Sequence, residues 1–253
     1  MKHHLWRQAC ALAAISIIIT GFSSTVFGYQ ERQLQNEDEP EHGWELDFTF
    51  GACAEGEEQS PINLEEALAI ADEEEVSVLY EPSLFTIENT GHTIRALAVS
   101  SENRMEIAGE SYHLVQLHFH IPSEHEVEGE QFDMELHFVH ENAAGQLAVL
   151  GVFLEKGEAS AELAKLSPEH LPVNMTEMRE IDLHQLLPPN KEGFYYDGSL
   201  TTPPCTEGVK WVVLTEPIGV TEEQFAMFAE IFPEYYRAVQ PLNDRNVYKI
   251  ILK

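Results

Sequence analysis

The chain has 253 residues, 43% of them hydrophobic, which is enough to bury the core of one large domain or of two small ones. Its formal net charge is −30 at pH 7, and a surface this acidic repels nucleic acid and anionic lipid. A nucleic-acid partner is therefore excluded, and we read the acidity as a source of solubility rather than as a binding surface for a cationic partner.

Residues 1–28 are typical of a secretory signal peptide. Lys2 and Arg7 make a basic start, an apolar run extends from Ala9 to about Phe22, and Gly28 marks the expected cleavage point. The apolar run is too short to span a bilayer comfortably. We therefore expect secretion to the periplasm or the extracellular medium, with no stable membrane insertion after cleavage; an N-terminal anchor is the alternative.

The rest of the chain divides into an acidic arm, residues 29–39, and a single domain, residues 40–253, because no repeat and no Gly/Ser- or Pro-rich linker interrupts it. After cleavage two cysteines remain, Cys53 and Cys205. In an exported chain two distant cysteines suggest one disulfide that closes a long loop, with two free thiols as the alternative.

Short segments of β character follow one another through the middle of the chain. Residues 111–121 and 133–140 both alternate in polarity, as half-buried strands do. Residues 146–154 and 209–214 are nearly continuous apolar runs that suit buried strands.

Helical patterns are fewer. Residues 160–166 predict a short helix, and residues 221–232 a longer one, because Thr221 and Gln224 have the spacing of a capping box. The predicted fold is mostly β, with a large sheet and a few peripheral helices.

Three histidines in the two alternating segments suggest a metal site. Alternation places Leu114, Gln116, His118 and His120 on one face, so that the two imidazoles can converge on one ion. His137, in the second alternating segment, would supply a third ligand. Three histidines with one open position are the donor set of a catalytic zinc site.

Polar residues beside these histidines fit a supporting role. Gln116 precedes His118 by two positions, and Glu135 stands in the same relation to His137. Ligating histidines usually donate their second ring N–H to such a group, and a carboxylate in an apolar strand needs a partner. Two solvent-facing polar residues are the alternative.

Together with further motifs, these residues resemble the α-carbonic anhydrases of bacterial type. The motifs that carry the resemblance keep the family's order from about residue 40 to 250; they are Gln59-Ser-Pro-Ile-Asn63, Gln116-Leu-His118-Phe-His120, Ser123-Glu124-His125, Glu135-Leu-His137, Gly198-Ser-Leu-Thr201-Thr-Pro-Pro204 and Gln240-Pro-Leu-Asn-Asp-Arg245. The resemblance implies a large, mainly antiparallel twisted sheet with short flanking helices. It also implies Zn²⁺ on His118, His120 and His137, and a Cys53–Cys205 disulfide.

The resemblance further implies reversible hydration of carbon dioxide to bicarbonate and a proton, by attack of a zinc-bound hydroxide. Thr201 would accept a hydrogen bond from the hydroxide and donate one to Glu124, and His92 would carry the released proton outward. The remaining substrate-binding positions would be Val139, Val149, Leu200, Thr202, Val209 and Trp211. For the apolar members of this set, simple core packing is nearly as good an interpretation.

Three departures from the family pattern concern proton transfer. The N-terminal tyrosine of the family has no match here, Thr90 replaces a usual asparagine, and Arg95 stands near His92, where a fixed positive charge would depress an imidazole pKa. Bacterial relatives often form dimers, but nothing in the sequence demonstrates an interface.

Three other classes of protein are less consistent with the sequence. A non-catalytic binding protein on the same fold would be expected to lack a metal ligand, and all three are present. A cupin would use Glu124 as a fourth ligand but lacks its second signature, and no His-Glu-x-x-His stretch indicates a metalloprotease.

Overall fold

The computed structural model describes residues 51–253, apart from 66–69, 72–74, 168, 170 and 232–235. These residues belong to one compact unit, Glu41–Lys253. The predicted signal peptide, the acidic arm and the first residues of the predicted domain lie outside the described residues.

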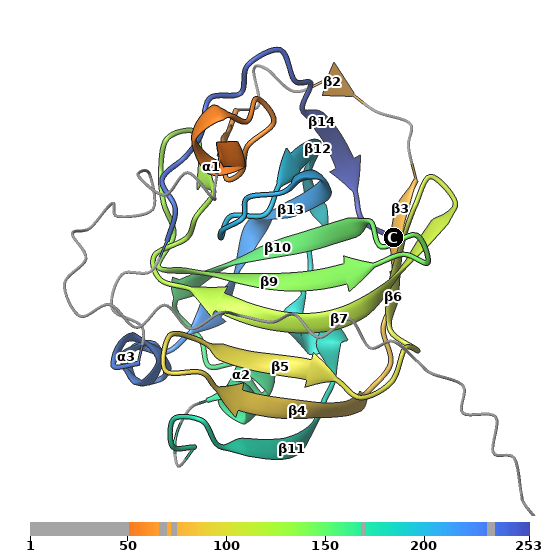
Figure 1. The fold of residues 1–253 in the computed structure, drawn as a ribbon. Coiled ribbons are helices and arrows are strands. Elements are labelled where there is room, and N and C mark those ends of the chain that lie inside the picture. Colours follow the sequence, from red (N-terminus) through yellow and green to blue (C-terminus); the bar gives the residue numbers. More distant parts are fainter. Residues whose placement is uncertain (1–50, 66–69, 72–74, 168, 170, 232–235) are drawn as a thin grey trace, which may run out of the picture. The chain divides into compact units, whose positions relative to one another are not determined.

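The described part of the chain consists mainly of strands (Figure 1). The strands are β1 (Asn63–Leu64), β2 (Ile70–Ala71), β3 (Val76–Leu79), β4 (Ser83–Asn89), β5 (Ile94–Ala98), β6 (Arg104–Ile107), β7 (Glu110–His120), β8 (Glu126–Val127), β9 (Met134–Glu141), β10 (Leu147–Lys156), β11 (Thr176–Ile181), β12 (Glu192–Ser199), β13 (Glu207–Val220) and β14 (Tyr248–Ile251). The helices are α1 (Gly51–Glu55), α2 (Ala161–Leu166), α3 (Glu222–Ala229) and a 3-10 helix, η3 (Leu183–Leu186).

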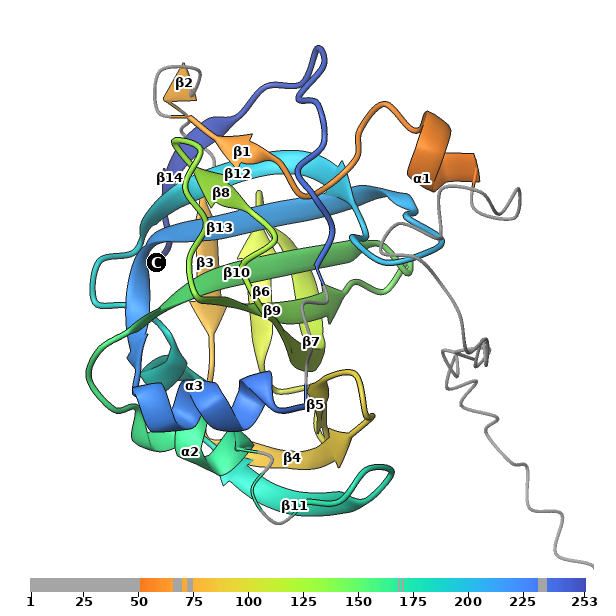
Figure 2. The same cartoon turned by 90° about the vertical axis from the view of Figure 1, so that its left-hand side faces the viewer.

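One 12-stranded sheet organises the unit, in the order β11-β4-β5-β7-β9-β10-β13-β12-β14-β2, with β6 beside β7 and β3 beside β6. Among its described pairings only β10–β13 and β14–β2 are parallel. The prediction of a large, mainly antiparallel sheet is confirmed, and Figure 2 shows how strongly it twists.

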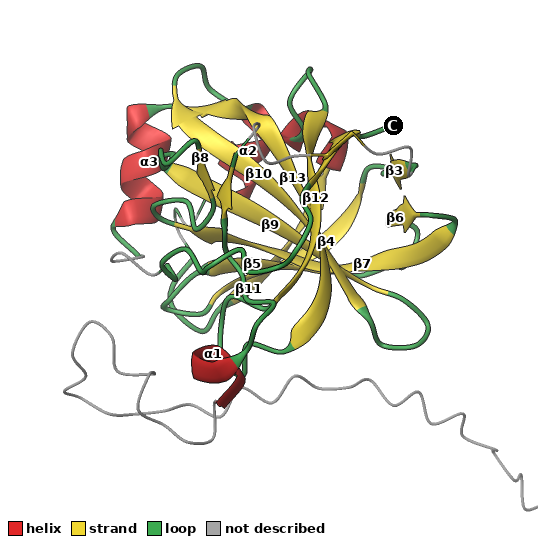
Figure 3. Ribbon diagram, turned by 90° about the horizontal axis from the view of Figure 1, so that it is seen from above, coloured by secondary structure: helices red, strands yellow, loops and turns green. Residues whose placement is uncertain are grey.

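The sheet buries side chains on both faces. On one face the larger core includes Leu117, Phe119 and Leu136, and α2 adds Leu163 and Leu166. The other face carries a second core around Trp211. Figure 3 shows the helices at the periphery of the strands. No helix among the described residues is long and apolar enough to cross a membrane.

Both predicted helices are present. Ser160 caps α2, accepting from Leu163 N–H, and Thr221 and Gln224 form the predicted capping box at α3. Helix α3 packs on the larger core, with the Phe228 ring 4.7 Å from that of Phe119. It ends at Ala229, three residues before the predicted end.

One detail of the predicted strand faces is wrong. The pairing of β7 with β9 shifts between Leu114 and Gln116, so Val115 bulges out and is 40% exposed. The bulge reverses the alternation on its N-terminal side. Leu114 therefore lies in the larger core with Leu117 instead of on the face of Gln116.

Candidate active site

The central strand pair β7–β9 brings three histidines together. His118 lies directly opposite His137 in the register, and His120 follows two residues later on the face of His118. The ring centroids are 5.0 Å apart for His118 and His120, 5.3 Å for His118 and His137, and 4.7 Å for His120 and His137. The cluster therefore comes from strand geometry and not from a flexible loop.

The donor atoms of this cluster suit a zinc ion. One ring nitrogen from each of His118, His120 and His137 lies within 4.8 Å of the others, and the two Nε2 atoms of His118 and His120 are 3.1 Å apart. Burial, together with His120 and His137, holds the pKa of the His118 imidazole well below its usual value. A neutral imidazole is the form that binds metal, so the residues present fit a three-histidine zinc site.

Each strand also supplies a polar group behind its histidine. The Nδ1 of His118 is 3.0 Å from Oε1 of Gln116, which leaves Nε2 facing the cluster. The Nε2 of His137 lies 2.9 Å from Oε1 of Glu135, although without the alignment of a hydrogen bond. Gln116 and Glu135 thus lie next to the histidines that the sequence analysis paired them with, and their supporting role stays a prediction.

Glu135 is the hub of a buried network. Its Oε2 accepts from the backbone N–H groups of Glu124 and His125, both at 2.9 Å, and its Oε1 lies 2.8 Å from Nδ1 of His125. Burial alone would raise the pKa of the Glu135 carboxyl, but His125 and His137 hold it well below its usual range. At Gly151, opposite His137, an added Cβ would come within 2.8 Å of Oε1 of Glu135.

The network continues to the second core. The Nε2 of His125 lies 2.7 Å from the hydroxyl of Tyr196, which donates to Oγ of Ser60 at 2.8 Å. His125, Glu135 and His137 also have the spacing of a metal-binding group. Because the carboxylate and the Tyr196 hydroxyl already engage His125, we interpret these three residues as a hydrogen-bonded support and not as a second metal site.

Glu124 presents one oxygen to the histidines. Its Oε1 accepts from the backbone N–H of Arg237 at 3.0 Å. Its buried Oε2 lies 3.5 Å from Nε2 of His120 and 4.0 Å from Nδ1 of His137, and has no hydrogen-bond partner. The predicted bond from the Thr201 hydroxyl to Glu124 is not among those formed in the described part of the chain, so Oε2 is the atom left to accept it.

Thr201 follows β12 in a loop that is held at both ends. Ser199, just before it, accepts from Ser60 N–H at 2.9 Å and donates its own N–H to Oγ of Ser60 at 3.0 Å. Beyond Thr201, Cys205 forms the predicted disulfide with Cys53. Thr201 itself is buried, and Thr202 is half-buried.

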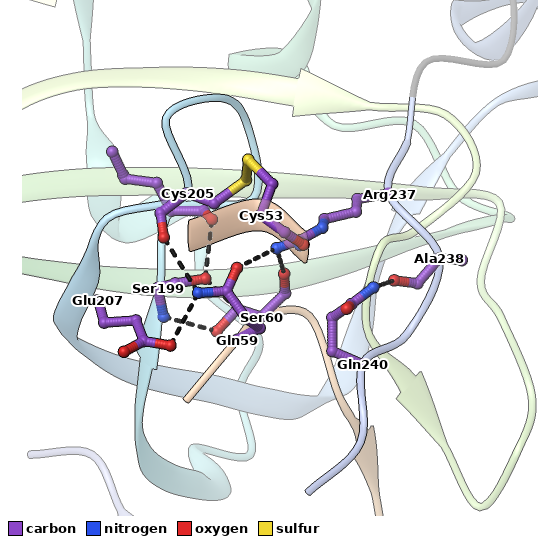
Figure 4. The surroundings of a disulfide bond; sticks show 10 residues. Cys53, Gln59, Ser60, Ser199, Cys205, Glu207, Arg237, Ala238 and Gln240 are labelled. Carbon is purple, nitrogen blue, oxygen red and sulfur yellow. Dashed lines mark hydrogen bonds between the residues drawn. A yellow bond between two sulfur atoms is a disulfide. The ribbon is translucent and has the colours of Figure 1, made fainter. Parts of the chain in front are cut away.

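Around the disulfide, polar side chains tie this loop to the rest of the unit (Figure 4). Gln59 donates to the carbonyl of Cys205 at 3.1 Å and to the Glu207 carboxylate at 2.9 Å. The Arg237 guanidinium donates to the side chain of Gln59 and to the carbonyls of Ser60 and Cys53. Three segments distant in sequence are thus fixed beside Thr201.

The five apolar residues expected to hold the substrate lie in one cluster. Four of them are buried in the second core and Leu200 packs against it; the four are Val139, Val149, Val209 and Trp211. The Trp211 ring centroid is 4.9 Å from that of His137. An apolar surface therefore adjoins the histidines, as both the substrate-binding and the core-packing interpretations require.

His92 is exposed in the turn between β4 and β5. Thr90 shapes this turn, since its hydroxyl accepts from the backbone N–H groups of His92 and Thr93 and donates to the Thr93 carbonyl. Arg95 lies opposite His118 in the register and pairs with Glu88 at 2.9 Å.

The sequence did not indicate Tyr196, Ser60 or Arg237 as parts of the site. His125 appeared only within the motif Ser123-Glu124-His125, with no role assigned to it. The available signal was weak: Arg237 is an arginine in a strongly acidic chain. If such a residue becomes buried, its guanidinium needs several hydrogen-bond acceptors, which implies a structural role.

Comparison with known proteins agrees with this geometry. Residues 38–251 match the family model described as eukaryotic-type carbonic anhydrase. A carbonic anhydrase of Nostoc sp. is 37% identical, over 97% of this chain and 97% of its own length. A carbonic anhydrase of Neisseria gonorrhoeae is 35% identical, over 93% of this chain and 94% of its own length.

Solved structures give the same result. The α-carbonic anhydrase of Thermovibrio ammonificans, in complex with the inhibitor sulfanilamide, is 38% identical with a TM-score of 0.75, over 81% of this chain and 93% of its own. The α-carbonic anhydrase of Photobacterium profundum is 34% identical with a TM-score of 0.75, over 83% of this chain and 98% of its own.

Proposed function

The chain belongs to the carbonic anhydrase family, whose activity is the zinc-dependent hydration of carbon dioxide, and from this we propose how its own residues carry out that reaction. His118, His120 and His137 would hold the zinc ion. The observation that carries the proposal is the convergence of three imidazoles from adjacent strands, two buried and one half-buried, with Gln116 and Glu135 beside two of them.

Zinc bound to three histidines, as carbonic anhydrases in general illustrate, lowers the pKa of a coordinated water to about 7 and so makes hydroxide available at neutral pH. The protein supplies an anionic environment that supports this cation. Glu135 is held ionised by its network, and the open Oε2 of Glu124 lies close to the ligand nitrogens. A fixed negative charge at this position also helps to retain a divalent ion.

Thr201 and Glu124 orient the nucleophile. Arg237 N–H already donates to Oε1 of Glu124, and Oε2 has no hydrogen-bond partner among the described residues, so Oε2 would accept the hydrogen bond from the Thr201 hydroxyl. Once that hydroxyl donates to Glu124, its own lone pairs must accept, which selects a single orientation for a donor beside it. Thr202 would add a polar contact for the substrate at the same end of the site.

Carbon dioxide is apolar and needs a dry surface next to the nucleophile. The cluster of Val139, Val149, Leu200, Val209 and Trp211 provides such a surface beside His137. Bicarbonate is charged and gains nothing from this wall, so the same surface favours release of the product.

His92 would deliver the proton to solvent. An imidazole ordinarily titrates near neutral pH, which suits a group that must both accept and release a proton. The exposed turn between β4 and β5 gives His92 contact with water.

The replacement His92→Ala tests this assignment. In weak buffer we expect kcat for hydration to fall by on the order of 10- to 100-fold, because proton release becomes limiting, while kcat/KM stays unchanged. Added imidazole buffer should restore kcat. His113→Ala, at another exposed histidine, is the matched control; an unchanged kcat in His92→Ala would remove His92 from the mechanism.

We also propose that the enzyme is secreted. The support is the Cys53–Cys205 disulfide, which persists in oxidising compartments, together with the basic and apolar pattern of residues 1–28. Detection of a mature N-terminus near residue 29 in the medium or the periplasm would test this. A full-length chain retained inside the cell would contradict it.

A further inference from the structure

Arg95 lies on the same face of the sheet as the histidine cluster. Strand β5 runs beside β7 (Figure 1), and Arg95 is directly opposite His118 in their antiparallel register. Side chains of directly opposite residues share a face of the sheet. The residues on either side of Arg95, Ile94 and Ala96, are fully buried in the larger core on the opposite face. The side chain of Arg95 is 24% exposed, so part of the guanidinium side chain remains open to solvent on the histidine face.

The guanidinium of Arg95 keeps donor capacity that the described residues do not use. Its Nη2 donates to Oε2 of Glu88 at 2.9 Å, whereas its buried Nε has no hydrogen-bond partner in the described part of the chain. Arg237 differs, because its guanidinium donates to the side chain of Gln59 and to two backbone carbonyls. A buried donor without an acceptor costs free energy. A further acceptor that approaches from the open side of Arg95 would therefore be favoured.

The positive charge of Arg95 acts on the site. Together with burial and the two neighbouring histidines, which have larger effects, Arg95 holds the pKa of the His118 imidazole below its usual value. This cation belongs to a chain with 44 acidic and 14 basic residues, and the field of such a chain repels anions. An anion that approaches the histidines therefore gains from a fixed cation on the same face.

We propose that Arg95 binds the anion of the proposed reaction, bicarbonate, on the open side of the three histidines. The inference rests on the proposed function for the identity of this anion, while the chemistry that Arg95 recognises is that of a small, planar oxyanion. A guanidinium is also planar and can donate two parallel N–H bonds to such a group. Glu88 holds the guanidinium but competes with the anion for it. The two members of this ion pair therefore have opposite effects on anion binding.

Titration of the zinc-loaded protein with sodium bicarbonate, followed by the backbone amide NMR signals of β5 and β7, tests the proposal without measuring turnover. Arg95→Gln should raise the Kd for bicarbonate by about 3- to 10-fold, because it removes both the charge and the paired donors. Arg95→Lys keeps the charge alone and should give a Kd between those of Arg95→Gln and the wild type. Glu88→Gln removes the competing carboxylate and should lower the Kd by about 2- to 5-fold.

The control is Arg104→Gln, which makes the same charge change on β6, where Arg104 lies opposite His113 and pairs with Glu106. It should leave the Kd unchanged. A purely structural ion pair would make Arg95→Gln and Glu88→Gln change the Kd in the same direction, and that result would overturn the proposal. A wild-type protein without saturable bicarbonate binding, or a Kd unaltered in Arg95→Gln, would also overturn it.

The same titration separates this inference from the proposed function. A protein that binds bicarbonate through Arg95 but does not hydrate carbon dioxide would refute the proposed function and leave the anion site in place. A protein that hydrates carbon dioxide rapidly, with a Kd for bicarbonate that is indifferent to Arg95, would refute the anion site alone.

Discussion

Among single residues, Glu135 has the widest influence on the candidate zinc site. Its carboxylate holds His125 and two backbone N–H groups while lying against His137, and the low pKa of its carboxyl keeps it ionised. We expect Glu135→Gln to weaken zinc binding by about 10- to 100-fold, because the amide supplies no charge and would present an N–H to groups that need an acceptor.

Zinc affinity, measured by competition with a chelator, checks this expectation. Glu141→Gln is the matched control, because Glu141 is the exposed last residue of the same strand. Equal affinities for Glu135→Gln and the wild type would show that the network does not support the metal.

His140 leads to an expectation about pH and stability. It is fully buried, with Nε2 2.9 Å from the Tyr80 hydroxyl, and burial lowers the pKa of its imidazole to about 4 from 6.5. Between pH 4 and pH 6.5 the unfolded chain therefore binds a proton at His140 that the folded chain does not bind. The resulting stability is complete above about pH 6.5 and is lost as the pH falls to 4, amounting to about 3 kcal/mol.

Denaturant unfolding of the wild type and of His140→Gln, both zinc-free, measures this contribution. The difference in unfolding free energy between the two proteins should shrink by about 3 kcal/mol from pH 7 to pH 4. A difference that is constant with pH would mean that His140 already titrates normally in the folded state.

The residues that the sequence could predict are those placed by local periodicity. Strand alternation alone pairs His118 with His120 and puts Gln116 and Glu135 beside the histidines. Tyr196 and Arg237 could not be found in this way, because their partners are more than 70 positions away in the chain. Tyr196 contacts His125 and Ser60. Arg237 contacts Glu124, Gln59, Ser60 and Cys53. Contacts over such separations depend on the fold and leave no periodic pattern.

Among the elements, the loop after β12 depends on the disulfide. The bond joins residues separated by 152 positions, and closing a loop of this length contributes about 5 kcal/mol in the chain-entropy model. We expect the double variant C53S/C205S to lose stability of this order in denaturant unfolding. It should also lower kcat, because the loop that carries Thr201 loses one of its anchors.

Ser160→Ala, which removes the distant cap of α2, is the control for a general loss of stability and should leave kcat unchanged. An unfolding midpoint in C53S/C205S equal to that of the wild type would contradict the assigned role of the disulfide.

The strands themselves were predictable wherever their polarity pattern was regular. The segments now seen as β7, β9 and β10 were placed within a residue or two. β13 extends six residues beyond its predicted apolar run, because its half-buried end pairs with the last residues of β10. The bulge at Val115 was missed for a related reason: it is visible only in the register with β9.

At the scale of the whole molecule, the fold places the two proposed requirements of the reaction on one sheet. The middle strands carry the three histidines proposed to bind zinc, and the second core supplies an apolar surface beside them. The resemblance implied a large, mainly antiparallel sheet but not the order of its strands, and periodicity does not specify which strands are neighbours.

The central claim is that His118, His120 and His137 hold a zinc ion that makes this chain hydrate carbon dioxide. Stopped-flow hydration from pH 6 to 9, on zinc-loaded and zinc-free protein and on His120→Ala, tests it most directly. We expect rapid hydration only with zinc in the wild type, rising with an apparent pKa near 7. A rate no higher than the uncatalysed background in protein that contains one zinc ion per chain would contradict it.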